Sequence, residues 1–195
     1  MHMTKKILSM ILAIVMVVSL FAGITISASA AGYAKATFIA AGDTVVLATD
    51  TAKMELTSIS TTSTKYGVGT AYSSVPAGTW ALTVEEGASA GTYSFKTAEG
   101  KYLYWTSGNS LNVTGTKDVK SSWNITFEED GTATIINANN AVRQIMWNKG
   151  SPRFACYDNS KNSIGSSYYA ITIYKLEADS GCSHVWVAGE TVAAT

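Results

Sequence analysis

The sequence predicts an all-β domain from Thr37 to Glu177, folded as a β-trefoil-like barrel of three repeats of about 45 residues. Short runs of alternating apolar or β-branched residues are interrupted about every 8 to 12 positions by glycine, asparagine, aspartate or serine. Apolar residues do not recur at helical spacing over any long stretch. This pattern is typical of barrels and sandwiches, so we expect almost no helix.

Three segments carry the same alternation of an aromatic, an aliphatic and an apolar residue: Trp80–Glu85, Trp123–Glu128 and Tyr169–Tyr174. They begin 43 and 46 positions apart. Because strand side chains alternate between two faces, the first, third and fifth residues of each segment point the same way. We therefore expect these nine residues in the core: Trp80, Leu82, Val84, Trp123, Ile125, Phe127, Tyr169, Ile171 and Ile173.

Units of this length cannot each bury an apolar face alone, so they should share one core. A β-trefoil has three units of four strands, which matches the repeat, whereas a four-bladed propeller would need another unit. A two-sheet β-sandwich is the alternative fold.

Residues 1–30 have the order of a secretory signal peptide. Lys5 and Lys6 precede a mainly apolar run from Ile7 to Ile26, and the small residues Ala28-Ser29-Ala30 follow it. The alternative is a retained membrane anchor, because the apolar run could span a bilayer. We expect cleavage, and hence a secreted or cell-surface protein that leaves the membrane after processing.

Residues 178–195 differ from the domain before them and suggest a linker followed by the start of a Cys/His module. Cys182 and His184 could donate two zinc ligands, but two ligands do not make a tetrahedral site. We therefore predict no metal and no cofactor, and we expect further domains beyond Thr195. Cys156 could pair with Cys182 in an oxidising compartment, or it could be a buried free thiol.

Charge and residue content restrict the function. Removal of Lys5 and Lys6 with the signal leaves 12 basic and 14 acidic residues, a net charge of −2 that argues against a nucleic-acid partner. Residues 37–177 contain no histidine, which excludes a histidine-activated nucleophile there. Two carboxylate pairs remain as catalytic candidates, Glu85-Glu86 and Glu128-Glu129, and we interpret them as solvated strand ends.

Aromatic residues are more numerous in the second half of the domain than a small core requires: Tyr102, Tyr104, Trp105, Trp147, Phe154 and Tyr157. An aromatic face beside polar groups suits stacking on a sugar, and an arginine there can hold a hydroxyl, carboxylate or phosphate in a forked hydrogen bond. The alternative for Arg153 is that it lies across Trp147 and closes the barrel. The predicted ligand site is Tyr104, Trp105, Trp147, Arg153 and Tyr157.

Three motifs, at residues 130–135 (DGTATI), 151–157 (SPRFACY) and 174–176 (YKL), resemble an accessory β-domain of large exported proteins of gut Firmicutes and Bacteroidetes. The tail resembles the start of the Cys/His repeats in such proteins. The resemblance implies an extracellular setting, here a Gram-positive gut bacterium. The chain departs from it at residues 143–147 (RQIMW), where such domains often have Arg-Tyr-Leu and then a tyrosine.

These observations favour a non-catalytic extracellular binding or adhesion module whose partner is a glycan or another cell-surface polymer. One alternative is a structural spacer within a larger secreted protein. A carboxylate-dependent, carbohydrate-active enzyme is the third hypothesis.

Overall fold

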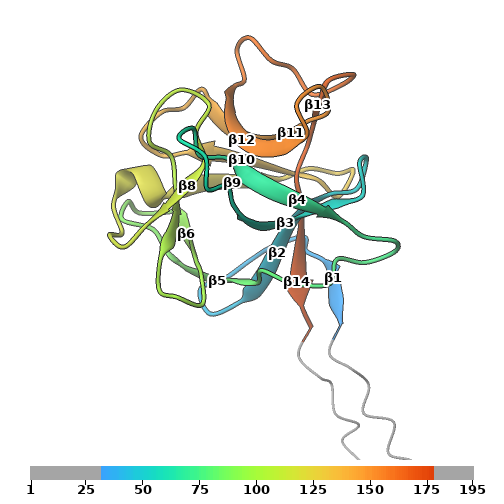
Figure 1. Cartoon of the computed structure of the whole chain (residues 1–195). Helices are drawn as coiled ribbons and strands as arrows, with labels where there is room; N and C mark the ends of the chain where they lie inside the picture. Colours follow the sequence, from blue (N-terminus) through green and yellow to red (C-terminus); the bar gives the residue numbers. More distant parts are fainter. Residues whose placement is uncertain (1–31, 178–195) are drawn as a thin grey trace, which may run out of the picture. The chain divides into compact units, whose positions relative to one another are not determined.

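Three consecutive four-stranded units form residues 32–177, the part of the chain that the computed structural model describes (Figure 1). The first unit contains β2 (Thr44–Thr49), β3 (Met54–Ile59), β4 (Gly67–Ala71) and β5 (Leu82–Glu86). The second contains β6 (Tyr93–Lys96), β7 (Tyr102–Tyr104), β8 (Asn112–Thr114) and β9 (Trp123–Phe127). The third contains β10 (Ala133–Asn137), β11 (Arg143–Asn148), β12 (Arg153–Asp158) and β14 (Thr172–Leu176).

The first and last strands of the units close into a six-stranded barrel. The neighbours are β2 and β5, β5 and β6, β6 and β9, β9 and β10, and β14 and β2. A single bridge joins Ala133 of β10 to Ile171, the residue before β14, and completes the ring.

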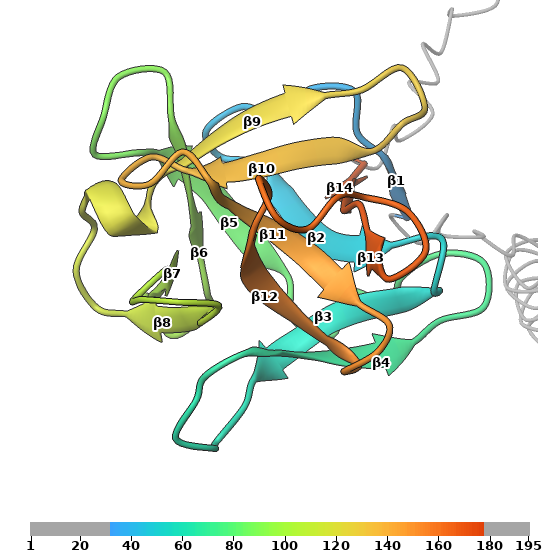
Figure 2. The ribbon, with the colours of Figure 1, turned by 90° about the horizontal axis from the view of Figure 1, so that it is seen from above.

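The middle strands of each unit pair as the hairpins β3–β4, β7–β8 and β11–β12. Seen from above, the β11–β12 hairpin lies beside the β3–β4 hairpin (Figure 2), and Phe154 of β12 pairs with Gly67 of β4. This is a β-trefoil-like fold, so the predicted fold class is confirmed over the two-sheet alternative.

The described residues also include three short elements outside the repeat. They are β1 (Tyr33–Lys35), the 3₁₀ helix η1 (Val119–Ser121) and β13 (Tyr168–Tyr169). Within residues 32–177, no helix is long and apolar enough to cross a membrane. The predicted signal peptide at 1–30 and the predicted module at 178–195 lie outside the described residues.

The alternation of apolar residues in the sequence identifies residues of the core. Leu82, Val84, Trp123, Ile171 and Ile173 are at most 1% exposed and lie in one apolar cluster. The other four predicted core residues are half-buried and pack against the edge of that cluster: Trp80, Ile125, Phe127 and Tyr169.

The three equivalent aromatic residues therefore differ in depth. Trp123 is the first residue of β9, is fully buried and donates a hydrogen bond from its indole nitrogen to the Leu103 carbonyl over 3.2 Å. Trp80 precedes β5, and Tyr169 lies in β13, so neither belongs to a barrel strand. The three repeats therefore agree in their barrel strands and differ at the aromatic residue where each of the three sequence segments begins.

β1 holds the start of the described chain against its end. Tyr33 lies opposite Leu176 in an antiparallel pair with β14, and the two strands lie side by side at the base of the barrel (Figure 1). Asp50 accepts hydrogen bonds from the hydroxyls of Tyr72 and Tyr174 and forms an ion pair with Lys35 of β1. Burial raises the pKa of Asp50, but the contacts with Lys35, Tyr72 and Tyr174 outweigh it and hold the pKa below its usual value.

Candidate ligand-binding site

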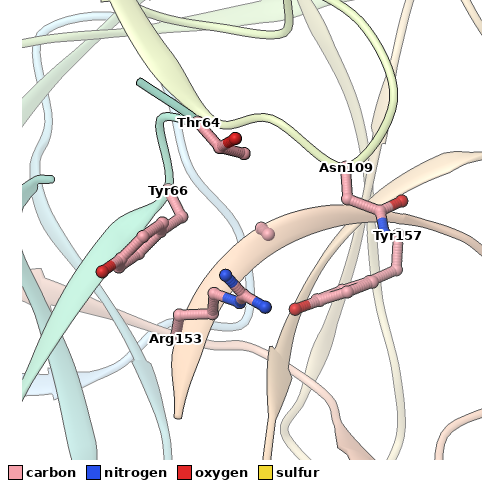
Figure 3. A pocket seen from close by; sticks show the side chains of 6 residues that line it. Thr64, Tyr66, Asn109, Arg153 and Tyr157 are labelled. Atoms are coloured by element: carbon pink, nitrogen blue, oxygen red, sulfur yellow. The ribbon is translucent and has the colours of Figure 1, made fainter. Parts of the chain in front are cut away.

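A cavity of about 140 Å³ lies where the hairpins of all three units meet (Figure 3). Six residues line it: Thr64, Tyr66, Asn109, Arg153, Ala155 and Tyr157. The first two come from the loop before β4 and Asn109 comes from the loop before β8, while the last three belong to β12. The site therefore exists only in the folded barrel, because its walls are far apart in the sequence.

Strand alternation explains the β12 wall. Phe154 and Cys156 point into the core and are fully buried. Arg153, Ala155 and Tyr157 consequently point to the opposite face, where they line the cavity.

Two wider hollows adjoin the cavity. One of about 300 Å³ shares Tyr66 and Arg153 with it and is completed by Ser151 and Pro152. The other, of about 480 Å³, shares Thr64 and Asn109 and is otherwise lined by residues 63, 65, 106–108, 110 and 112. We call the cavity and these two hollows the cap groove.

Arg153 occupies the centre of the cap groove. Its guanidinium points into the space between Thr64, Tyr66 and Tyr157 (Figure 3), and its carbon Cζ lies 5.2 Å from the centre of the Tyr66 ring. Its Nε is buried and has no hydrogen-bond partner among residues 32–177. Buried polar groups are usually paired, so an orphaned N–H marks a position where an acceptor would be favourable.

Tyr157 presents a second orphaned group. The residue is 3% exposed, and its ring packs edge-on against Tyr168 with 4.8 Å between centroids. Its hydroxyl points toward Arg153 (Figure 3), yet it too lacks a hydrogen-bond partner within the described part of the chain. The Arg153 Nε and the Tyr157 hydroxyl thus belong to residues that line the same cavity, and they form no hydrogen bond with each other.

The loops that face β12 are held by their own hydrogen bonds. The Ser110 hydroxyl oxygen accepts bonds from the amides of Thr106 and Ser107 over 3.2 and 3.0 Å. Arg143 donates to the Asn109 side-chain oxygen over 3.1 Å and also lies 4.0 Å from Asp158. These bonds fix the Asn109 wall of the groove before any ligand arrives.

The structure separates the five residues of the predicted site. Arg153 and Tyr157 line the same cavity. Trp105 is 8% exposed and donates its indole N–H to the Gly108 carbonyl over 2.9 Å. It therefore stabilises the loop before β8 and does not itself line the groove. Tyr104 is half-buried in β7 and does not line the groove.

Trp147 was predicted in the ligand site, but it lines no part of the cap groove. It is 4% exposed and packs edge-on against Phe154 in the main core, with 4.9 Å between centroids. On the other face of the β11–β12 hairpin, Tyr157 and two neighbours form a small apolar cluster with Tyr66 and Tyr168. Both faces of this hairpin are therefore covered, which accounts for the aromatic residues that exceeded the needs of one core.

Four residues of the cavity were missed from the sequence, namely Ala155 of β12 and three loop residues, Thr64, Tyr66 and Asn109. Thr64 and Asn109 stand in polar stretches that read only as turns, and such stretches are common in every β domain. Tyr66 stood in a weakly apolar run before β4. No local pattern distinguished these residues from other loop positions.

The Glu85 carboxylate, a catalytic candidate, is held in an ion-pair cluster. It lies 2.8 Å from the Lys96 ammonium and 3.0 Å from that of Lys117, and it accepts a bond from the Tyr102 hydroxyl over 3.0 Å. The hydrogen bonds from Lys96 and Lys117 lower the pKa of Glu85 to about 2. An acid held ionised in this way is poorly suited to donate a proton at neutral pH.

The sequence also drew attention to a cysteine and to metal ligands. The Cys156 thiol is free and fully buried, and burial raises its pKa well above the usual value. Within residues 32–177, no cluster of three histidine, cysteine or acidic side chains could hold a metal ion.

No protein-family model and no curated protein matches the sequence. The fold is similar to solved structures at low identity. The Polyporus squamosus lectin, bound to the epitope Neu5Aca2-6Galb1-4GlcNAc, has a TM-score of 0.53 at 15% identity, covering 71% of this chain and 51% of the lectin. Lysenin in complex with phosphocholine has a TM-score of 0.52 at 16% identity, covering 72% of this chain and 46% of lysenin.

A salivary protein from Culex quiquefasciatus, of the Cysteine and Tryptophan-Rich family, has a TM-score of 0.53 at 17% identity, covering 72% of this chain and 98% of that protein. By contrast, this chain spans about half of the lectin and less than half of lysenin. At these identities the similarities establish the β-trefoil-like fold alone.

Proposed function

We propose that this chain is a non-catalytic extracellular binding module that holds carbohydrate in the cap groove. The observation that carries the proposal is the pair of unpartnered groups on Arg153 and Tyr157, which converge on a preformed cavity. Saccharides supply hydroxyl groups that can satisfy both, and ligand sites combine such a few placed polar groups with an apolar wall. The Tyr66 and Tyr157 rings provide that wall, and serine, threonine and asparagine provide the rim.

Two further observations support this function. The Polyporus squamosus lectin, which was solved with a bound saccharide, shares the fold. The signal sequence at residues 1–30 favours export. Mass spectrometry of exported material should therefore give a chain that begins near Ala31, and a mass that retains Ile7 to Ile26 would instead indicate a membrane anchor.

A spacer role is the second candidate, and the burial of two tryptophans favours it. Trp105 and Trp147 are the residues best suited to stack on a sugar, yet they are 8% and 4% exposed. If these rings only stabilise the barrel, the domain could serve to separate other modules of a larger secreted protein.

A glycan array probed with the chain tests the binding function. We expect specific retention of at least one class of saccharide, which Thr64→Val should weaken roughly two- to ten-fold because it removes one hydroxyl from the cavity. Thr116→Val is the matched control, since Thr116 is exposed and lines no part of the groove. Absence of binding to every glycan would refute the function and favour the spacer role.

A further inference from the structure

We infer that the cap groove selects an acidic saccharide and that Arg153 holds its carboxylate. This inference rests on the proposed function and narrows it to one class of ligand.

The first argument is the charge state of Arg153. A guanidinium remains protonated at any physiological pH, and taking it out of water without an anionic partner is costly. Arg153 is half-buried, and its Nε is buried with no hydrogen-bond partner in residues 32–177. Arg143, the other arginine of the chain, also has an unpartnered Nε, but it lies beside the Asp158 carboxylate and donates to Asn109.

The second argument is the charge of the whole groove. Among the residues that line the cavity and its two hollows, Arg153 and Lys65 are the charged side chains, and both are positive. No aspartate or glutamate lines any of the three. The full chain has a formal net charge of zero, so this local excess of positive charge is a property of the groove. Such a lining attracts anions and disfavours cations.

The third argument is the orientation of the donors. The Tyr66 ring, 5.2 Å from Cζ, holds the Arg153 guanidinium in place on one side. The Tyr157 hydroxyl points to the same space (Figure 3). A planar guanidinium fork matches the two oxygens of a carboxylate, and the phenol can donate a further bond to one of them.

The size and charge of the cavity favour a carboxylate over a phosphate. The 140 Å³ cavity accommodates one small group, while the wider hollows on both sides leave room for the rest of an oligosaccharide. Arg153 is the charged side chain that lines the 140 Å³ cavity itself, since Lys65 lines the wider hollow, and one guanidinium balances one negative charge. A phosphate monoester carries between one and two charges at neutral pH and would leave part of its charge unmatched there.

The test uses pairs of saccharides that differ only in the charged group. The array presents uronic- and sialic-acid oligosaccharides, each beside its own methyl ester, together with sulfated and phosphorylated sugars. We expect each acid that binds to be retained roughly 10- to 100-fold more tightly than its ester, as for hydrogen bonds to charged groups. Raising the salt concentration should reduce this preference.

Variants assign the preference to Arg153. Arg153→Gln should abolish the difference between acid and ester, and Arg153→Lys should retain part of it because the charge remains without the fork. Lys149→Gln is the matched control, since it removes one positive charge from an exposed turn residue outside the groove. Thermal melts of every variant show whether the domain is folded, and Arg153→Lys keeps the test decisive if Arg153→Gln unfolds.

Three results would overturn the inference, and they differ in what they leave intact. Equal retention of acids and esters would remove the acidic specificity while the carbohydrate-binding function remained. Preference for sulfated or phosphorylated sugars would reject the carboxylate assignment. Failure to retain any saccharide would reject both proposals together.

Discussion

Replacing Tyr157 by phenylalanine should stabilise the free protein, although it changes a residue of the candidate site. The buried hydroxyl has no hydrogen-bond partner among residues 32–177. An unpaired buried donor of this kind costs about 1–3 kcal/mol, and phenylalanine avoids that cost. The ring itself should keep its edge-on contact with Tyr168.

We expect a gain of about 1 kcal/mol in the free energy of unfolding, the lower end of that range, because local relaxation recovers part of the cost. For a domain of this size, that gain corresponds to a rise in Tm of roughly 2–4 °C. Urea unfolding followed by tryptophan fluorescence, and thermal unfolding followed by circular dichroism, measure the two quantities.

Tyr102→Phe provides a control with the same chemical change and the opposite expected sign. The Tyr102 hydroxyl donates to Glu85 over 3.0 Å, so its removal should cost about 0.5–1.5 kcal/mol. If Tyr157→Phe lowers stability as much as the control does, then the Tyr157 hydroxyl has a partner in the free protein. The reasoning that assigns it to a ligand would then fail.

Three further changes test the core, a close backbone contact and an ion pair. Trp123→Ala should lower the free energy of unfolding by roughly 3–5 kcal/mol in urea titrations, and a loss below about 1 kcal/mol would contradict its burial. Gly69→Ala should cost about 1–3 kcal/mol in the same titrations, because the added methyl would lie 2.6 Å from Cζ3 of Trp147; an unchanged midpoint would show that β4 can move aside. Glu85→Gln should remove a stabilisation that is complete above about pH 4.5 and lost as the pH falls toward 2, since the pKa of Glu85 is lowered to about 2 in the folded state. Urea unfolding at a series of pH values should therefore show wild type and variant converging in acid, and a constant difference would refute the assignment.

The sequence predicted the fold because barrel strands follow a local rule. The alternation in Trp123, Ile125 and Phe127 places one face of β9 toward the core, and its recurrence after 43 and 46 positions gives the number of units. A period of two within a strand and a spacing between repeats are both visible along the chain. No tertiary information was needed for either.

The site could be predicted only in part, because its members obey no such rule. Arg153 attracted attention as one of two arginines, and Tyr157 shares its strand face. Trp147 was misplaced because it packs into the main core against Phe154. The aromatic residues of the opposite face of β11–β12 are covered by Tyr66 and Tyr168, which come from other segments of the chain. Whether a surplus aromatic residue lies on the surface or in a second apolar cluster depends on these long-range contacts.

The pairing of β1 with β14 determines how the domain would respond to tension. Tyr33 and Leu176 are opposite one another at the open end of this antiparallel pair, so both ends of the domain leave from the same place. A force that separates the two ends loads the hydrogen bonds of the pair one after another, beginning at Tyr33, instead of shearing them together. If the domain joins a surface anchor to a further module, β1 should peel away at low force and lengthen the connection while the barrel and the cap groove stay folded.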